Sequence, residues 1–107
     1  MITITEHQFK QVIELDYRRK PPLYAWKKDM IGSTCIREYI LDGKVVIRMT
    51  TLDCDQVKSE YDSTYEADSD LVQEASYIYI PTMEDFDYWE KMGLDEAEEI
   101  AKLEKQP

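Results

Sequence analysis

Carboxylates are the most abundant of the side chains in this sequence that could take part in catalysis or metal binding. The tightest pairs lie in Asp53-Cys54-Asp55 and Asp68-Ser69-Asp70. A calcium loop of the EF-hand type needs a glycine at its sixth position and a glutamate at its twelfth. Counted from Asp62, these positions hold Ala67 and Gln73, so the pattern fails. Zinc is disfavoured because the chain has one histidine and two separated cysteines. We therefore predict no metal and no cofactor.

Nucleophilic catalysis needs a nucleophile, a base and an orienting group close together. The single histidine, His7, falls on the exposed side of the first predicted helix, far along the chain from Cys35. The glycines never cluster, so the chain has neither a GxGxxG motif nor a P-loop. Carboxylate acid–base catalysis has no sequence motif, and nothing marks one pair among so many acids. We predict that the chain is not an enzyme and has no catalytic residues.

The net charge of −10 is unevenly distributed along the chain. Residues 1–50 hold nine Lys and Arg against six Asp and Glu, whereas residues 51–107 hold four Lys against seventeen acids, a balance of −13. Direct nucleic-acid binding is disfavoured, because phosphate contacts need a basic face. An acidic surface favours a basic protein as partner.

The acidic segment at residues 60–70 interleaves carboxylates with tyrosines. One interpretation is a solvated charge run that keeps the chain dissolved. The other is an array of charges that imitates a nucleic-acid backbone and occupies a basic groove, with tyrosines as anchors. We take its members as the candidate partner-binding residues, and the aromatic helix predicted over 82–92 as a further candidate. The members are Glu60, Tyr61, Asp62, Tyr65, Glu66, Asp68 and Asp70.

A second candidate patch comes from a predicted hairpin over residues 34–51. Asp42-Gly43 between two β-rich runs is typical of a two-residue turn. The turn predicts Ile40 opposite Val45 and Arg37 opposite Arg48. One predicted face, the core face, carries Ile36, Ile40, Val45, Ile47 and Met49. The other carries Arg37, Tyr39, Lys44, Val46 and Arg48.

Like charges directly opposed across two strands destabilise a sheet. The predicted Arg37–Arg48 pair therefore has three explanations: acids from 53–74 fold over this face, the face binds an anion or a partner, or the register differs. Arg37, Tyr39 and Arg48 form the secondary candidate patch.

The remaining elements follow from caps and periodicity. A capping box at Thr5 begins a helix that stops before Pro21-Pro22. A short strand is predicted at 23–26, and another at 76–80 with Ile78 on the core face. Helices begin at Thr82, ending at Gly93, and at Asp95. Residues 53–74 fit a short helix or a loop.

These elements predict one α+β domain over residues 1–107. Its small antiparallel sheet is built on the hairpin (about 34–51) plus a strand near 76–80, and the N-terminal helix and the C-terminal helices cover it. From the core face of the sheet we expect contacts with Phe9, Ile13, Phe86 and Trp89.

The predicted function is that of a non-catalytic acidic protein-binding domain. It would inhibit or modulate a basic nucleic-acid-handling protein or defence complex as a nucleic-acid mimic. The alternative is a small assembly or accessory subunit, and the sequence leaves room for a homo-oligomer. No apolar run reaches the roughly 18 residues of a membrane span, and the N-terminus lacks signal-peptide features. We expect a cytoplasmic protein with reduced Cys35 and Cys54.

Overall fold

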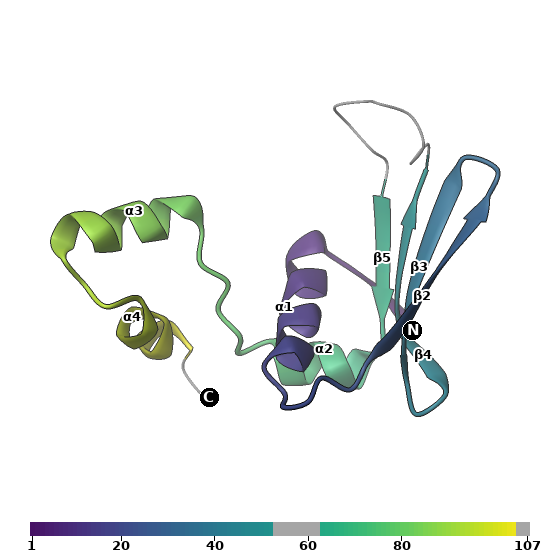
Figure 1. The fold of residues 1–107 in the computed structure, drawn as a ribbon, viewed down its shortest axis with the longest axis horizontal. Helices are drawn as coiled ribbons and strands as arrows, with labels where there is room; N and C mark the ends of the chain where they lie inside the picture. The colour runs from purple at the N-terminus through teal and green to yellow at the C-terminus, as the bar shows by residue number, and fades with distance from the viewer. Residues whose placement is uncertain (53–62, 105–107) are drawn as a thin grey trace.

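The computed structural model describes residues 1–52 and 63–104. It contains a five-stranded antiparallel sheet with four helices, which confirms the α+β class (Figure 1). The strand order is β1-β5-β4-β3-β2. The elements in chain order are β1 (Ile2–Ile4), α1 (Glu6–Tyr17), β2 (Ala25–Ile31), β3 (Thr34–Leu41), β4 (Lys44–Thr51), β5 (Ser63–Ala67), α2 (Ser69–Ala75), α3 (Met83–Met92) and α4 (Glu96–Leu103).

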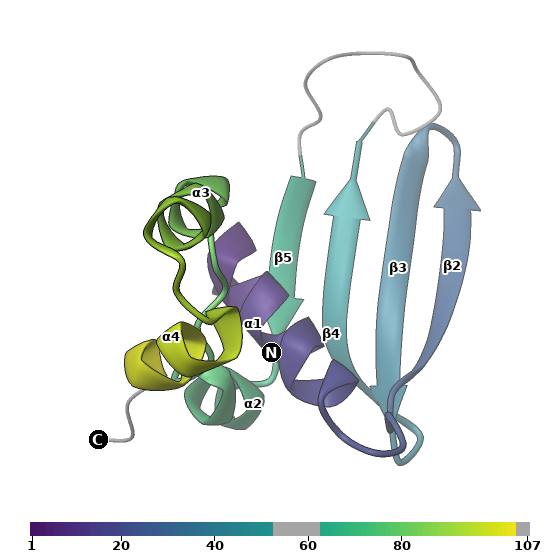
Figure 2. The ribbon, with the colours of Figure 1, turned by 60° about the vertical axis from the view of Figure 1, so that its left-hand side comes forward.

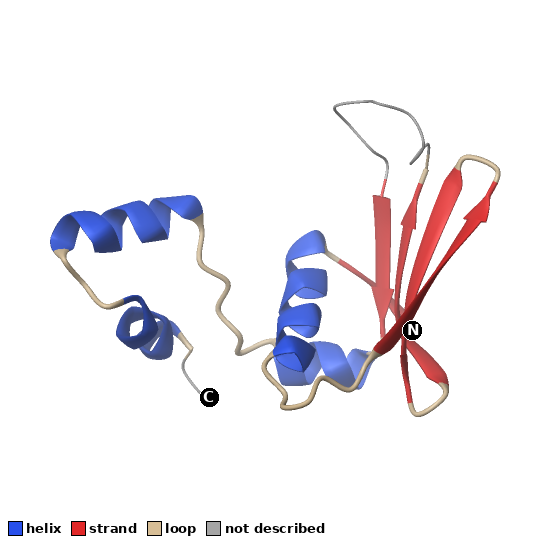
Figure 3. Cartoon of the chain, in the orientation of Figure 1, coloured by secondary structure: helices blue, strands red, loops and turns tan. Residues whose placement is uncertain are grey.

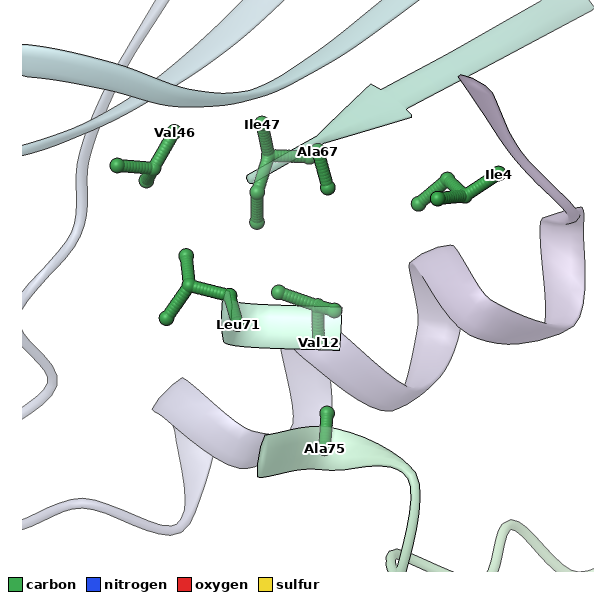
Figure 4. Packing of buried hydrophobic residues seen from close by; sticks show 7 residues of the cluster. All are labelled: Ile4, Val12, Val46, Ile47, Ala67, Leu71 and Ala75. Carbon is green, nitrogen blue, oxygen red and sulfur yellow. The ribbon is translucent and has the colours of Figure 1, made fainter. Parts of the chain in front are cut away.

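The core lies between one face of the sheet and the first two helices. α1 and α2 pack on this inner face, and α3 and α4 lie farther out on the same side (Figures 1 and 2). Among the described elements, no helix lies on the opposite, outer face. The buried cluster, drawn in Figure 4, contains Ile4, Val12, Val46, Ile47, Ala67, Leu71 and Ala75.

Helix α1 begins and ends as its sequence predicts. The Thr5 side chain accepts a hydrogen bond from the Gln8 N–H, and Gln8 Oε1 accepts one from the Thr5 N–H, so the capping box is confirmed. Near the other end, the buried Asp16 carboxylate accepts hydrogen bonds from the N–H groups of Leu23 (2.8 Å) and Tyr24 (3.1 Å). A buried carboxylate is tolerated when it is hydrogen-bonded, and here it fixes where the chain enters β2.

The hairpin of β3 and β4 turns at Asp42-Gly43, as predicted. Both residues have positive φ, 52° and 78°, and Ile40 faces Val45. Beyond this pair the register shifts, so that Tyr39 faces Ile47 and Val46 has no partner in the ladder. A β-bulge of this kind adds one residue to a strand. It allows the neighbours Val46 and Ile47 to be 5% and 0% exposed, which strict alternation would forbid.

The bulge overturns part of the predicted register. Arg37 faces Met49 and Glu38 faces Arg48, so the predicted opposition of Arg37 and Arg48 is wrong. The predicted faces of β3 are also inverted. Arg37 and Tyr39 lie on the inner face, and the residues alternating with them, Ile36, Glu38 and Ile40, lie on the outer face.

The predicted strand at 76–80 is wrong. Figure 3 draws the segment between α2 and α3 as a loop, and no residue of 76–80 pairs with the sheet. Ile78 is nevertheless buried, and its carbonyl accepts a hydrogen bond from Gln11 Nε2 at 2.8 Å. Its apolar side chain is thus sheltered beside α1 without joining the ladder. The sheet is completed instead by β1 and β5, which pair with each other from distant parts of the chain.

Three further predictions are revised by the structure. Of the short strand predicted at 23–26, residues 25 and 26 begin the longer β2, and residues 23 and 24 precede it. Phe86 and Trp89, which we expected over the sheet, pack edge to face on each other with ring centroids 5.6 Å apart. Of residues 53–74, predicted as a helix or a loop, the described part from residue 63 onward forms β5 and most of α2.

Candidate functional site

The strongest concentration of charge in the described chain lies on α3 and α4. We call residues 82–104 the acidic arm. Residues 83–104 carry nine carboxylates and two lysines, a net charge of −7. Six of these carboxylates belong to exposed residues: Glu84, Asp87, Glu90, Asp95, Glu96 and Glu98.

Local sequence signals build the acidic arm. Thr82 caps α3 in a capping box with Asp85, and Gly93 ends the helix with φ 69°, the left-handed conformation that glycine adopts at little cost. Asp95 then caps α4 by accepting a hydrogen bond from the Glu98 N–H. The Thr82 N–H and, second, the Tyr79 hydroxyl donate to the Asp85 carboxylate and lower its pKa.

Polar contacts tie the acidic arm to helix α1. Glu104, after α4, forms an ion pair with Arg18 at the end of α1. The same Glu104 oxygen accepts a hydrogen bond from the Tyr79 N–H at 3.3 Å. Together with the bond from Gln11 to the Ile78 carbonyl, these contacts link the connector and the residue after α4 to α1. Six carboxylates of the acidic arm remain exposed.

Large apolar side chains are exposed among these carboxylates. On α3, Met83 is 74% exposed, Tyr88 57% and Met92 56%, and Leu94 and Leu103 are exposed as well. Tyr88 and Met92 are four residues apart and therefore neighbours on one side of the helix. Tyrosine and methionine are enriched at protein interfaces. The acidic arm thus combines charge with apolar anchors.

The acidic segment predicted as the partner-binding surface is only partly described. Glu60, Tyr61 and Asp62 lie outside the described residues. The Tyr65 ring packs against Phe9 on the inner face, with centroids 4.8 Å apart. Its neighbour Glu66 lies on the outer face by the alternation of β5.

The last two residues of that segment belong to the start of α2. Asp68 caps this helix by accepting a hydrogen bond from the Asp70 N–H at 3.0 Å, and it forms an ion pair with Lys44 at 3.4 Å. The Asp70 N–H contact is the largest influence lowering the pKa of Asp68. Asp70 is exposed. The structure therefore does not bring the four described members onto one surface, and their role in binding stays a prediction.

The secondary patch is also divided between two faces. Arg48 lies on the outer face, where its Nε and Nη2 donate to one Glu38 oxygen at 3.0 and 2.9 Å. Lys27 Nζ reaches the other Glu38 oxygen at 3.5 Å, and Arg48 Nη1 lies 3.8 Å from Glu66. These four residues form a row across β2, β3, β4 and β5, which we call the outer charge row. The Arg48 guanidinium lowers the pKa of Glu38.

Arg37 and Tyr39, the other two members of the secondary patch, line a cleft on the inner face. Acids of 53–74 were one explanation offered for the cationic face. Of these, Glu66 does reach Arg48, but the principal partner of Arg48 is Glu38 on the neighbouring strand. The sequence-based register hid this pair because it placed Glu38 opposite Ile47.

Residues 1–52 and 63–104 hold no group of three His, Cys, Asp or Glu side chains placed to bind a metal ion. No helix in this part of the chain has the length and apolar character needed to cross a bilayer. Cys35 is a buried free thiol, and Cys54 lies outside the described residues. No protein-family model, no curated protein and no solved structure matches this chain.

Proposed function

We propose that this chain is a non-catalytic protein-binding domain whose acidic arm docks on a basic partner. The observation that carries the proposal is the exposure of six carboxylates beside Tyr88 and Met92 on one helical pair. Carboxylates attract a basic surface over a distance of about 8–10 Å at physiological salt. Aromatic and methionine side chains that become buried on docking then supply contact energy at short range.

A nucleic-acid-handling protein is the class of partner that this chemistry fits best. Such proteins have basic grooves that neutralise phosphates in a row. Carboxylates spaced along α3 and α4 present a comparable series of negative charges on two helices. A domain that occupied the groove would inhibit or modulate the partner by excluding its nucleic acid.

The test begins with capture of the partner from the native host on the immobilised chain, with identification by mass. The association rate is then measured at several salt concentrations for the parent and for two double variants of equal charge change. Asp87→Lys/Glu90→Lys alters the acidic arm, and Glu60→Lys/Asp62→Lys alters the acidic segment predicted from sequence. We expect the first variant to lose at least tenfold in affinity, because electrostatic attraction becomes repulsion.

Two further measurements separate charge from apolar contact. Tyr88→Ala should increase the dissociation rate with little effect on association, because a hot-spot side chain acts after encounter. Added DNA should displace the partner if the acidic arm occupies a nucleic-acid groove. The proposal is wrong for the acidic arm if Asp87→Lys/Glu90→Lys binds as tightly as the parent. If Glu60→Lys/Asp62→Lys alone weakens binding, the acidic segment is the docking surface.

A second candidate function is that of an assembly subunit, and strand β2 favours it. β2 is an edge strand, and all seven of its residues are exposed, including Trp26 at 60% and Ile31 at 66%. An exposed edge strand is a template for pairing with another chain. This function predicts a stable oligomer that resists salt, measured by light scattering after size-exclusion chromatography. Trp26→Glu/Ile31→Glu should dissociate it, whereas Asp87→Lys/Glu90→Lys should not.

A further inference from the structure

The inner face of the sheet is only partly filled by α1, and a cleft remains beside that helix. Its volume is about 310 Å³, at the lower end of the ~300–1,000 Å³ typical of ligand pockets. A second cavity of about 160 Å³ shares Ile13 and Tyr39 with it and extends toward β2. The side chains that form most of the cleft wall are Phe9, Ile13, Arg37, Tyr39, Met49 and Ile80.

Arg37 is the charged residue that the sheet contributes to this cleft. Its Nε is buried and donates no hydrogen bond among the described residues, and its guanidinium stacks on the Trp26 ring at 5.2 Å. A buried donor without an acceptor costs free energy that a ligand can recover. Arg37 has no ion-pair partner in residues 1–52 and 63–104.

A second cation lies directly across the strand pair. Lys28 on β2 faces Arg37 on β3, so the two side chains share the inner face. Lys28 likewise has no ion-pair partner in the described ranges. Like charges opposed in this way destabilise a sheet unless an anion or water compensates them. On the outer face, in contrast, each cation of the charge row meets a carboxylate.

We propose that this cleft binds a small organic anion with an apolar body, such as a medium-chain or aryl carboxylate. The carboxylate would meet the guanidinium of Arg37 and the ammonium of Lys28, and the apolar body would lie between Phe9, Ile13 and Met49. An arginine fork matches a carboxylate in shape as well as in charge. This site is independent of the acidic arm and of its proposed partner.

Two other charged residues of α1 line the cleft, and each is already paired. Glu14 Oε1 lies 3.3 Å from Arg18 Nε, and Lys10 Nζ lies 3.8 Å from Glu6 Oε1. Glu14 disfavours a ligand with several negative charges, so a monoanion fits better than a phosphate. In the adjoining cavity, the Tyr24 hydroxyl is buried without a hydrogen-bond partner in the described chain. Burial raises the pKa of Tyr24 to about 12, which keeps that hydroxyl protonated as a donor.

The probe for the test is octanoate, titrated into the ¹⁵N-labelled full chain and followed by NMR. We expect the Arg37 Nε–Hε signal to shift in a saturable manner. Octanol has the same apolar chain without the charge and should bind at least tenfold more weakly, because a charge-assisted hydrogen bond is lost. Acetate has the charge without the chain and should also bind at least tenfold more weakly.

Matched variants assign the binding to the inner face. Arg37→Met should weaken octanoate binding at least tenfold, and Lys28→Met should weaken it severalfold. Lys27→Met is the control, because this neighbouring lysine lies on the outer face and should leave binding unchanged. The proposal is overturned if octanoate does not bind, if octanol binds as tightly, or if Lys27→Met and Lys28→Met weaken binding equally. Loss of folding in Arg37→Met, checked by its amide spectrum, leaves the two lysine variants to decide.

Discussion

The two faces of the sheet differ in whether their cations have carboxylate partners. On the outer face, Arg48 sits between Glu38 and Glu66 in the outer charge row. On the inner face, Arg37 and Lys28 oppose each other, and no carboxylate of the described chain pairs with either. The outer arrangement needs nothing from outside the molecule. The inner arrangement is completed only by solvent or by a bound anion.

The difference matters energetically because polar groups on both faces are largely buried. Glu38 has a side chain only 12% exposed and gains its hydrogen bonds from Arg48 on the same sheet. Arg37, in contrast, has a buried Nε with no acceptor in the described residues. A buried polar group without a partner in a native structure calls for an explanation, and a bound water, ion or ligand is one. The inner face is therefore the better place to look for a ligand.

The largest expected effect concerns the part of the inner face that is a true core. Ile47→Ala should lower the free energy of unfolding by ~2–5 kcal/mol, because Ile47 is fully buried and leaves a cavity. Ile36→Ala, a change of the same size at a half-buried outer-face position, should cost clearly less. Urea denaturation measures both. An equal loss would show that the two faces are packed alike.

A smaller effect is expected at the turn that sets which residues of β4 reach each face. Gly43 has φ 78°, a conformation that a β-branched residue strongly resists. Gly43→Val should therefore cost about 1–2 kcal/mol, on the scale of left-handed strain for a residue with a Cβ. A thermal melt measures the loss. If the stability is unchanged, the turn does not fix the register, and the assignment of faces loses its local basis.

Local sequence signals predicted most of the elements but not the sheet that unites them. Thr5, Asp42-Gly43, Thr82 and Gly93 marked element ends because caps and turns depend on neighbouring residues. The pairing of β1 with β5 links residues about 60 positions apart in the sequence, and no local pattern reveals it. The segment 76–80 alternated like a strand, yet Ile78 obtains its burial beside α1 instead.

The prediction of the candidate sites failed at a single inserted residue. With Val46 in the ladder, the hairpin placed Arg37 against Arg48 and suggested one cationic patch. With Val46 bulged out, each of the two arginines belongs to a different face. Bulges have no reliable sequence signature, but the adjacent Val45-Val46-Ile47 run was a hint that strict alternation would not hold. The cation that does oppose Arg37 is Lys28, a pair that the sequence analysis did not predict.

A comparison of the two arginines tests the faces directly. Arg48→Met removes the hydrogen-bond donors of the sheltered Glu38 and should cost about 1 kcal/mol, a typical value for a hydrogen bond. The loss is limited because the Arg48 side chain is 36% exposed, so that solvent screens its interaction with Glu38. Arg37→Met removes the stacking of the guanidinium on Trp26 but also its repulsion from Lys28, and it leaves no described carboxylate unpaired, so it should change stability by less than ~0.5 kcal/mol. Equal losses in urea denaturation would contradict the distinction.

The smallest expected effect is the pH dependence of that difference. Arg48 lowers the pKa of Glu38 in the folded chain below its ordinary value of about 4.3. A carboxylate with a lowered pKa contributes stability above its unfolded pKa, and this contribution is lost as the pH falls through the folded pKa. The stability gap between the parent and Arg48→Met should therefore be largest near pH 6 and shrink as the pH is lowered toward 3. The gap between the parent and Arg37→Met should stay constant over the same range, because no described carboxylate pairs with Arg37. Urea denaturation at pH 6 and pH 3 measures both gaps. If the stability difference between the parent and Arg37→Met shrinks in acid, Arg37 has a carboxylate partner within the chain. The cations of the inner face would then be paired internally, like those of the outer face.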